Sequence, residues 1–364
     1  MSKARQLADL GNVYDDGALS NRNVIVNGAM VISQRGTSFT SVGNGDYTLD
    51  RFRVYSSGGG VFNVDQASDG PDDFTKSLKV TVATNDASIG SSDYYMLNSR
   101  LEGYDTAQFN FGTSAAKTVT LSFYVKSSLT GTFGGSFTNS SETNAYIFSY
   151  TINAANTWER KTVTITGQTS GTWATDNTNS IRIYWDLGCG SGNVSGSTGW
   201  GSGAYGLSGT VQLVGTSSAT WQMTGVQLEV GDLSTATPFE HRSYGDELAR
   251  CQRYYYKTYN DSTAPSTATN VGIVSSTLSQ SFQNTGYIEL YNVPYAVKMR
   301  ASPTITVYDT SGNSGKCNYY QSATLVVNNT ITSHAISENG FAVYSDNVTS
   351  KGGIGFHFTA DAEL

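Results

Sequence analysis

The sequence predicts an all-β fold built of two sandwiches, because short strand-like segments recur along it with turn residues between them. Only 14% of the 364 residues are charged, against about 25% in an average soluble domain, and the chain carries 39 Gly and 23 Tyr. This composition holds too little Lys, Glu, Leu and Ala for a helical bundle or a coiled coil. It also holds too many aromatic and β-branched residues for a disordered chain.

A short helix and a linker are expected before the first sandwich. Residues 2–10 place Leu7, Leu10 and two alanines on one helical face, and Gly11 is a suitable stop. A helix this short is below the roughly 12–15 residues that are stable alone, so it must dock on another surface. We therefore expect residues 1–22 to form a docking helix and linker, with Leu7 and Leu10 as the docking residues.

Residues 23–239 are expected to form the first and larger sandwich. Gly, Ser and Asn separate their apolar and alternating runs, and no convincing helix lies between these runs. Such a pattern favours an antiparallel sandwich or barrel over alternating strands and helices. The expected strands are 24–26, 51–55, 77–82, 118–125, 145–152, 160–165, 180–187, 210–214 and 220–230.

One helix is expected to connect the two sandwiches, over residues 240–258. Acidic residues near its start and basic residues in its last turns are typical of a helix. The residues that recur on one face, and that we expect at an oligomer interface, are Leu248, Cys251 and Tyr255.

Residues 259–364 are expected to form the second, smaller sandwich. After a loose stretch rich in Ser, Thr and Ala, strand-like runs return with Gly, Ser and Asn turns between them. A module of about 95 residues is a normal size for this architecture. The expected strands are 286–293, 303–308, 323–327, 340–344 and 353–359.

Charge, apolar runs and cysteines limit where the protein acts. A net charge of −7 with 22 basic residues argues against a general nucleic-acid partner. The sequence shows no secretory signal and no apolar run near the ~18–20 residues of a membrane span. Cys189, Cys251 and Cys317 lack metal or redox spacing, which indicates free thiols and synthesis in a reducing cytoplasm. The composition, by contrast, is typical of extracellular β-proteins. A virion protein, assembled in a host and exposed after lysis, would account for both cytoplasmic synthesis and this composition.

Two segments of the sequence resemble a known family. The first is 23–39, where Gln-Arg-Gly-Thr follows a short run ending in Asn-Gly, together with the Tyr-x-x-Asp-Arg-aromatic pattern of 47–52. The second is 221–231, continued through 237–255. Both resemble segments of tailed-bacteriophage fibre and virion proteins that carry a jelly roll of the carbohydrate-binding-module type. The resemblance covers residues 20–258 well and extends more weakly to the end.

The resemblance implies a non-enzymatic virion protein, commonly a homotrimer, that serves surface attachment or capsid decoration. It implies a jelly roll over residues 23–239 and another virion protein bound to residues 1–20, and we expect no cofactor and no membrane insertion. Many soluble members of the carbohydrate-binding jelly-roll group have an acidic and an aromatic residue just after the first Asn-Gly, and a structural calcium nearby. Here Ala29, Met30 and Val31 follow instead, so we predict no metal site.

A search for catalytic patterns finds none that identifies an enzyme. His241, His334 and His357 lie outside any metal-ligand or nucleophile-elbow pattern. A glycosidase needs two carboxylates about 5–10 Å apart, and no acidic residue here carries an identifying motif. Since no phosphate-binding glycine loop is present either, we expect a protein without enzymatic activity.

Sugar binding requires only aromatic faces and polar groups, and the sequence offers both in the first sandwich. Trp200 and Tyr205 are the only large side chains of a long Gly/Ser loop, so we predict an exposed pair there. Such aromatics could instead pack against a neighbouring subunit, and Asp186 could cap its strand rather than bind sugar. The predicted carbohydrate-binding residues are Trp200, Tyr205, Trp173, Tyr94, Tyr95 and Asp186.

These patterns leave three functions open. The combination of jelly roll, helix and terminal sandwich best fits a trimeric tail fibre that attaches to host-surface polysaccharide. The alternative is a head-fibre or decoration protein of the capsid, and a polysaccharide depolymerase is a third hypothesis. In the first two, the protein is made in the host bacterial cytoplasm and resides in the virion.

Overall fold

The computed structural model describes residues 21–231, 236–275, 281–284, 286–321, 324–348 and 353–364. The chain divides into two compact units. Described residues of the first unit lie in 21–31, 38–48 and 52–243, and those of the second in 32–37, 49–51 and 244–364. The second unit thus contains two short segments that the predicted boundaries placed in the first sandwich. The predicted helix over 2–10, with Leu7 and Leu10, lies outside the described residues.

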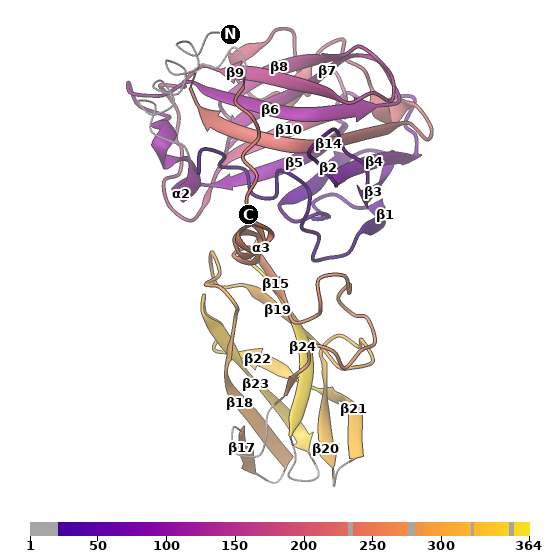
Figure 1. Cartoon of the computed structure of the whole chain (residues 1–364), viewed down its shortest axis with the longest axis vertical. Coiled ribbons are helices and arrows are strands. Elements are labelled where there is room, and N and C mark those ends of the chain that lie inside the picture. The colour runs from indigo at the N-terminus through magenta and orange to yellow at the C-terminus, as the bar shows by residue number, and fades with distance from the viewer. Residues whose placement is uncertain (1–20, 232–235, 276–280, 285, 322–323, 349–352) are drawn as a thin grey trace. The chain divides into compact units, whose positions relative to one another are not determined.

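Two six-stranded antiparallel sheets make up the first unit (Figure 1). In order, the first sheet contains β1 (Ser38–Val42), β3 (Val61–Ala67), β4 (Ser77–Thr84), β14 (Thr220–Val230), β6 (Val119–Ser127) and β9 (Glu159–Ile165). The second contains β12 (Gly199–Gly201), β8 (Ala145–Ile152), β7 (Gly131–Asn139), β10 (Asn179–Cys189), β5 (Tyr94–Glu102) and β2 (Phe52–Ser57). The short elements are α2 (Gly103–Thr106), η1 (Ala107–Phe109), β11 (Val194–Ser195), β13 (Gly206–Leu207) and η2 (Leu213–Gly215).

The inner faces of these two sheets share one aromatic-rich core. The ring centroid of Phe123 on β6 lies 6.0 Å from that of Trp185 on β10 and 5.1 Å from that of Tyr150 on β8. Trp221 of β14 donates its indole N–H to the Tyr150 hydroxyl at 3.2 Å. Every second residue of a strand points to the same face, so alternation supplies this core. The predicted all-β sandwich class is confirmed.

Two predicted strands of the first unit are wrong. Residues 24–26 are buried without forming a strand, although the Val24 N–H donates to the Leu228 carbonyl of β14 at 3.1 Å. Residues 210–214 lead into the turn η2 instead. Residues 24–26 are buried, as are Leu213 and Val214 in the second run, and burial by itself does not distinguish a strand from a turn.

The clearest strand that the sequence patterns missed is β7, because Gly134 and Gly135 make it resemble a turn. The fold requires a small residue at this place. A Cβ atom on Gly135 would lie 2.4 Å from both the Phe148 ring and the Tyr184 carbonyl oxygen. The glycines of this segment therefore reflect close packing inside a sheet rather than a turn.

The second unit is organised around β24 (Ile354–Asp361). This strand pairs antiparallel with four others: β15 (Tyr255–Lys257), β16 (Val274–Ser275), β19 (Thr304–Tyr308) and β20 (Lys316–Gln321). β21 (Thr324–Thr330) extends that sheet beyond β20. A second sheet contains β17 (Ser281–Asn284), β18 (Gly286–Pro294), β23 (Gly340–Val348) and β22 (Thr332–His334).

His357 of β24 is a satisfied core histidine. It is fully buried, one ring nitrogen lies 3.0 Å from the Thr269 carbonyl oxygen, and the other lies 3.2 Å from the Thr258 hydroxyl. Its ring stacks on Tyr259 with 4.1 Å between centroids. Burial lowers the pKa of this histidine below its usual value, so the neutral ring is the favoured form.

Residues 32–37 and 49–51 contribute a hydrogen-bonded group to the second unit. The side-chain amide of Gln34 donates to Asp50 at 2.6 Å and to the Tyr255 carbonyl at 2.7 Å. The backbone N–H of Gln34 donates to the other Asp50 oxygen at 2.7 Å. The Arg35 guanidinium lies 3.7 Å from the centroid of the Tyr255 ring. Residues of both resembled sequence segments thus meet within this unit.

Ion pairs connect the same two short segments to the last residues of the chain. The guanidinium of Arg51 pairs with Glu363, whose side chain is 4% exposed, and lies 3.5 Å from the centroid of the Tyr254 ring. Arg35 pairs with Asp361 at 3.1 Å and with Glu363 at 3.5 Å. The buried Glu363 carboxylate therefore depends on two arginines that are distant in sequence.

The helix predicted over 240–258 is shorter in the structure. α3 spans Tyr244–Gln252, and Tyr255 already belongs to β15. The expectation that Leu248, Cys251 and Tyr255 share one helical face is therefore wrong. Cys251 and Tyr255 are buried within their own unit, so neither could contact another copy of the chain without leaving that core.

Candidate functional site

The structure separates Trp200 from Tyr205, and the predicted exposed pair is wrong. Trp200 of β12 lies opposite Tyr146 of β8, which lies opposite Phe137 of β7. Cross-strand partners share a face, so Trp200 belongs to the inner face of the second sheet. Tyr205 instead packs on Tyr184 of β10, with 5.2 Å between ring centroids. Because the chain neighbours of Tyr184 point into the core, Tyr205 lies over the outer face.

Trp173 joins Trp200 at the edge of the sandwich. The two ring centroids are 6.0 Å apart, and Phe111 lies 4.9 Å from the first ring and 6.2 Å from the second. The Trp200 N–H donates to the Thr166 carbonyl at 2.8 Å, and the Trp173 N–H to the Ser170 carbonyl at 3.0 Å. Both indoles therefore close the edge of the core, with their N–H groups already used.

Four tyrosines gather over the outer face of the second sheet. Tyr55 of β2 stacks on Tyr94 of β5 with 4.7 Å between centroids, and Tyr205 lies 5.6 Å from Tyr94 and 6.0 Å from Tyr55. Tyr184 of β10 is buried beneath the other three, which are half-buried. The sequence selected Tyr94 and Tyr205, and the fold adds Tyr55 and Tyr184. We call these four residues the tyrosine cluster.

Glu142, in the turn between β7 and β8, is hydrogen-bonded to two members of the tyrosine cluster. It accepts hydrogen bonds from the Tyr184 hydroxyl at 2.5 Å and the Tyr205 hydroxyl at 2.8 Å, and it pairs with Arg182. Its φ of +60° is an uncommon conformation for a residue other than glycine. Burial, reinforced by the Glu142 charge, raises the pKa values of Tyr184 and Tyr205. Both hydroxyls therefore stay protonated and can donate.

Three arginines lie beside the tyrosine cluster on the same face. Arg100 of β5 is the cross-strand partner of Arg182 on β10. Arg53 of β2 is the partner of Asn98 on β5, which in turn is the partner of Tyr184. The Arg100 Nε donates to the Asn98 side-chain oxygen at 3.4 Å. The outer face thus presents aromatic rings, guanidinium groups and one carboxylate together.

Tyr95 and Asp186 do not reach this surface. Tyr95 is fully buried, donates to Asp86 at 2.7 Å and accepts from the Gly60 N–H at 2.9 Å. Asp186 is also fully buried, and it accepts from the Gly188 N–H at 2.8 Å and the Thr210 hydroxyl at 3.4 Å. The expected contact of these two side chains with sugar is therefore not supported by their placement, since the fold covers both.

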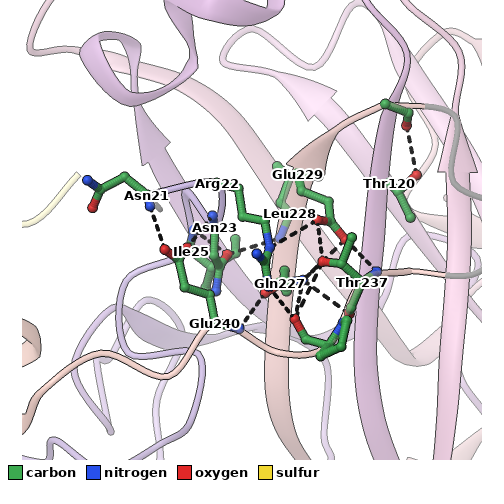
Figure 2. Close-up of polar contacts among 12 residues, drawn as sticks. Asn21, Arg22, Asn23, Ile25, Thr120, Gln227, Leu228, Glu229, Thr237 and Glu240 are labelled. Carbon is green, nitrogen blue, oxygen red and sulfur yellow. Dashed lines mark hydrogen bonds and ion pairs between the residues drawn. The ribbon is translucent and has the colours of Figure 1, made fainter. Parts of the chain in front are cut away.

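Figure 2 shows that the second resembled segment carries a structural network around Glu229 of β14. This carboxylate accepts from the Thr237 hydroxyl at 2.6 Å, the Thr237 N–H at 3.1 Å and the Gln227 amide at 3.1 Å. Arg22 lies 3.5 Å away. The side chain is 2% exposed, so Glu229 serves the fold.

Glu240 and Asn23 extend this network to the start of the described chain (Figure 2). Glu240 accepts from the backbone N–H groups of Asn21 at 2.5 Å and Asn23 at 2.8 Å. The Asn23 side chain accepts from the Leu228 N–H and donates to the Val226 carbonyl, both at 3.1 Å. These hydrogen bonds attach Asn23, the first residue of the first resembled segment, to β14.

In the described parts of the chain, no three His, Cys, Asp or Glu side chains lie close enough together to hold a metal ion. Nor do these residues contain a helix that is long and apolar enough to cross a membrane. The three cysteines are buried free thiols, as the sequence predicts.

Comparison with known proteins identifies structural similarities only. No protein-family model matches the chain, and no curated protein matches it. Among solved structures, the enzymatically active domain of bacteriophage CBA120 tailspike protein 4 is similar over 58% of this chain. The identity is 13%, the TM-score is 0.33, and the match spans only 22% of the tailspike chain.

Several carbohydrate-binding modules are similar at the same level. A CBM4 structure matches over 56% of this chain and 98% of its own, with 16% identity and a TM-score of 0.31. TmCBM61, solved with β-1,4-galactotriose, matches over 58% of this chain and 99% of its own, with 9% identity and a TM-score of 0.30. These similarities are too distant to carry an inference about what this chain binds.

Sequence reasoning missed Arg53, Tyr55 and Glu142, although a signal existed for two of them. The alternation of 51–55 places Arg53 and Tyr55 on the face opposite the core. Glu142 lies in a polar hairpin turn that nothing in the sequence distinguishes from other turns. The order of the strands, which brings these residues together, cannot be read from the local pattern.

Proposed function

We propose that this chain is a glycan-binding protein without enzymatic activity and that the outer face of the second sheet is its binding site. The observation that carries this proposal is the tyrosine cluster gathered around Glu142. Aromatic rings pack on the C–H surfaces of sugars, while carboxylate, amide and guanidinium groups bond the hydroxyls. Aromatic rings, guanidinium groups and a carboxylate occur together on one face of the second sheet.

The state of the acidic residues supports binding rather than hydrolysis. A glycosidase needs two carboxylates about 5–10 Å apart on either side of the scissile bond. Glu142 is already engaged by two tyrosine hydroxyls and Arg182. Asp186 and Glu229 are both buried in structural hydrogen bonds.

We further propose that the chain acts in a tailed-bacteriophage virion, as a trimeric tail fibre that attaches to host-surface polysaccharide. The two resembled sequence segments support this assignment. Residues 1–20, with Leu7 and Leu10, would bind another virion protein. A head-fibre or decoration protein of the capsid is the alternative, which the same segments support equally.

Glycan-array binding tests the proposed site. The full chain should bind at least one bacterial surface polysaccharide, and the double variant Tyr94→Ala, Tyr205→Ala should lose that binding. Tyr104→Ala is the matched control, because Tyr104 is 64% exposed on α2, away from the tyrosine cluster. Binding that survives the double variant would remove this site, and turnover of any bound polysaccharide would overturn the non-enzymatic assignment.

Assembly and location test the virion assignment. Light scattering of the full chain should give the mass of a trimer, and a strict monomer would contradict the fibre proposal. Imaging of virions that carry a labelled chain should place the label on the tail. A label on the capsid would favour the decoration alternative instead.

A further inference from the structure

The arginines beside the tyrosine cluster indicate the charge of the ligand. Arg182 has a partner in Glu142. For the Arg53 side chain, the described residues provide neither a hydrogen bond nor an ion pair, and its buried Nε is without an acceptor. Its guanidinium lies 5.5 Å from the ring centroid of Tyr55 and 5.7 Å from that of Tyr47. Arg53 as a whole is only partly buried, and a guanidinium group without an anionic partner pairs readily with a carboxylate, so this place is suited to an incoming anion.

The surroundings of Arg100 show that positive charge accumulates here. Burial lowers the pKa of this guanidinium, and the positive charges of Arg53 and Arg182 lower it further. Arg182 and Arg100 are direct cross-strand partners. Since Glu142 is shared by Arg182 and two tyrosine hydroxyls, it offers little compensation to Arg53.

We propose that this face binds an acidic glycan, one whose sugar units carry carboxylate groups, and that Arg53 receives a carboxylate of the ligand. This inference rests on the proposed function and names the substrate class of the same site. The guanidinium fork matches a carboxylate with two parallel hydrogen bonds. A carboxylate would also relieve the repulsion among the three arginines, which a neutral sugar hydroxyl cannot do. The tyrosine rings would hold the adjoining sugar.

Titration calorimetry on the full chain tests this inference with matched probes. The acidic probes are oligosaccharides of galacturonate, mannuronate, hyaluronan and sialic acid, each with its carboxyl groups free or methyl-esterified. The neutral probes are β-1,4-galactotriose and a mixed-linkage glucan tetrasaccharide. At least one free acid should bind, its methyl ester should bind about ten-fold more weakly or worse, and added salt should weaken the binding of the free acid.

Substitution of Arg53 assigns the effect to this residue. Arg53→Gln should weaken binding of the free acid about ten-fold and should barely change binding of the methyl ester. Arg53→Lys keeps the positive charge but lacks the guanidinium fork. Its affinity for the free acid should therefore lie between those of the wild type and Arg53→Gln. Lys117→Gln is the matched control, because it removes one positive charge at an exposed residue just before β6 of the other sheet. Circular dichroism of each variant shows that it folds.

The outcomes separate this inference from the proposed function. If a neutral probe binds and Tyr94→Ala, Tyr205→Ala abolishes that binding while no acidic probe binds, the proposed function stands and the acidic ligand is refuted. Equal affinities for a free acid and its methyl ester would also refute the acidic ligand. So would an Arg53→Gln variant that binds the free acid as tightly as the wild type does. If no probe of either kind binds, the proposed function fails together with this inference.

Discussion

Asp186 illustrates how its surroundings determine what a single side chain does. From the sequence it resembled a sugar ligand beside Trp185, but the structure buries it beneath the backbone of Gly206, whose Cβ, if present, would lie 2.0 Å from a carboxylate oxygen. Burial raises the pKa of Asp186 to about 6. The hydrogen bonds from Cys189, Gly188 and Thr210 lower this pKa but do not cancel the effect of burial. The folded protein therefore carries a carboxylate that resists ionisation.

A pH-dependent stability difference follows for Asp186. Because its folded pKa of about 6 lies above the unfolded value, the folded state binds the proton more strongly, and this site gains stability as pH falls through 6. Between pH 7 and pH 4.5 the wild type should gain about 2 kcal/mol relative to Asp186→Asn. Thermal unfolding of both proteins across this range measures the difference, and parallel curves would contradict the prediction.

Glu229 is a second residue whose role depends on burial. Glu229→Ala should lower the free energy of unfolding of the first unit by about 3 kcal/mol, because it leaves Thr237, Gln227 and Arg22 without their shared acceptor. Denaturant unfolding measures this loss. Asp72→Ala, at an exposed turn residue, is the control and should change stability by less than about 0.5 kcal/mol. Similar values for the two variants would contradict a structural role.

At the scale of elements, β14 depends on the close passage of another backbone. A Cβ on Gly28 would lie 2.1 Å from the Val226 carbonyl oxygen, and the Val226 N–H donates to the Gly28 carbonyl at 2.9 Å. The register of β14 against β6 shifts between Thr224 and Gln227, where Gly225 has a φ of +63°. The glycine of the Asn27-Gly28 pair is thus required by proximity to another strand.

Gly28→Ala should therefore destabilise the first unit by about 2 kcal/mol, since the added methyl group meets backbone that cannot move alone. Gly59→Ala is the matched control, because nothing lies within 4 Å of a Cβ at that position. Thermal unfolding of both variants gives the comparison. Equal melting temperatures would show that the segment before β1 tolerates a shift away from β14.

At the scale of the whole molecule, each unit has its own core, but the second unit does not consist of one continuous segment. Its Glu363 carboxylate is buried against Arg35 and Arg51, and Gln34 donates to the Tyr255 carbonyl. A boundary drawn only by sequence, between 258 and 259, separates these partners. The unit needs residues that lie more than 300 positions apart in the chain.

An isolated fragment of residues 244–364 should accordingly be less stable than the same unit in the full chain. Without Arg35 and Arg51, burial of the Glu363 charge is uncompensated, and the loss should amount to about 3 kcal/mol. Glu363→Gln should recover part of this loss in the fragment and should destabilise the full chain. If the fragment unfolds at the temperature of the second unit in the full chain, this dependence is refuted.

Much of the fold was predictable from local sequence patterns, and much of the candidate site was not. Alternation in 77–82, 145–152 and 220–230 identified real strands, because the side chains of a strand point to the same face every two residues. Local patterns failed for the glycine-rich β7 and for the apolar run 210–214. In both, contacts with distant residues outweighed the local preference.

Sequence patterns alone were enough to predict the all-β class, the free thiols and two aromatic residues of the candidate site, Tyr94 and Tyr205. These follow from composition, periodicity and residue type, which are local properties. Three other features follow from the folded chain and not from local patterns: Trp200 faces the core edge, Asp186 is covered, and Arg53 lies beside the tyrosine cluster. The reason is physical: which strands become neighbours depends on the packing of the whole core, and no single segment contains that information.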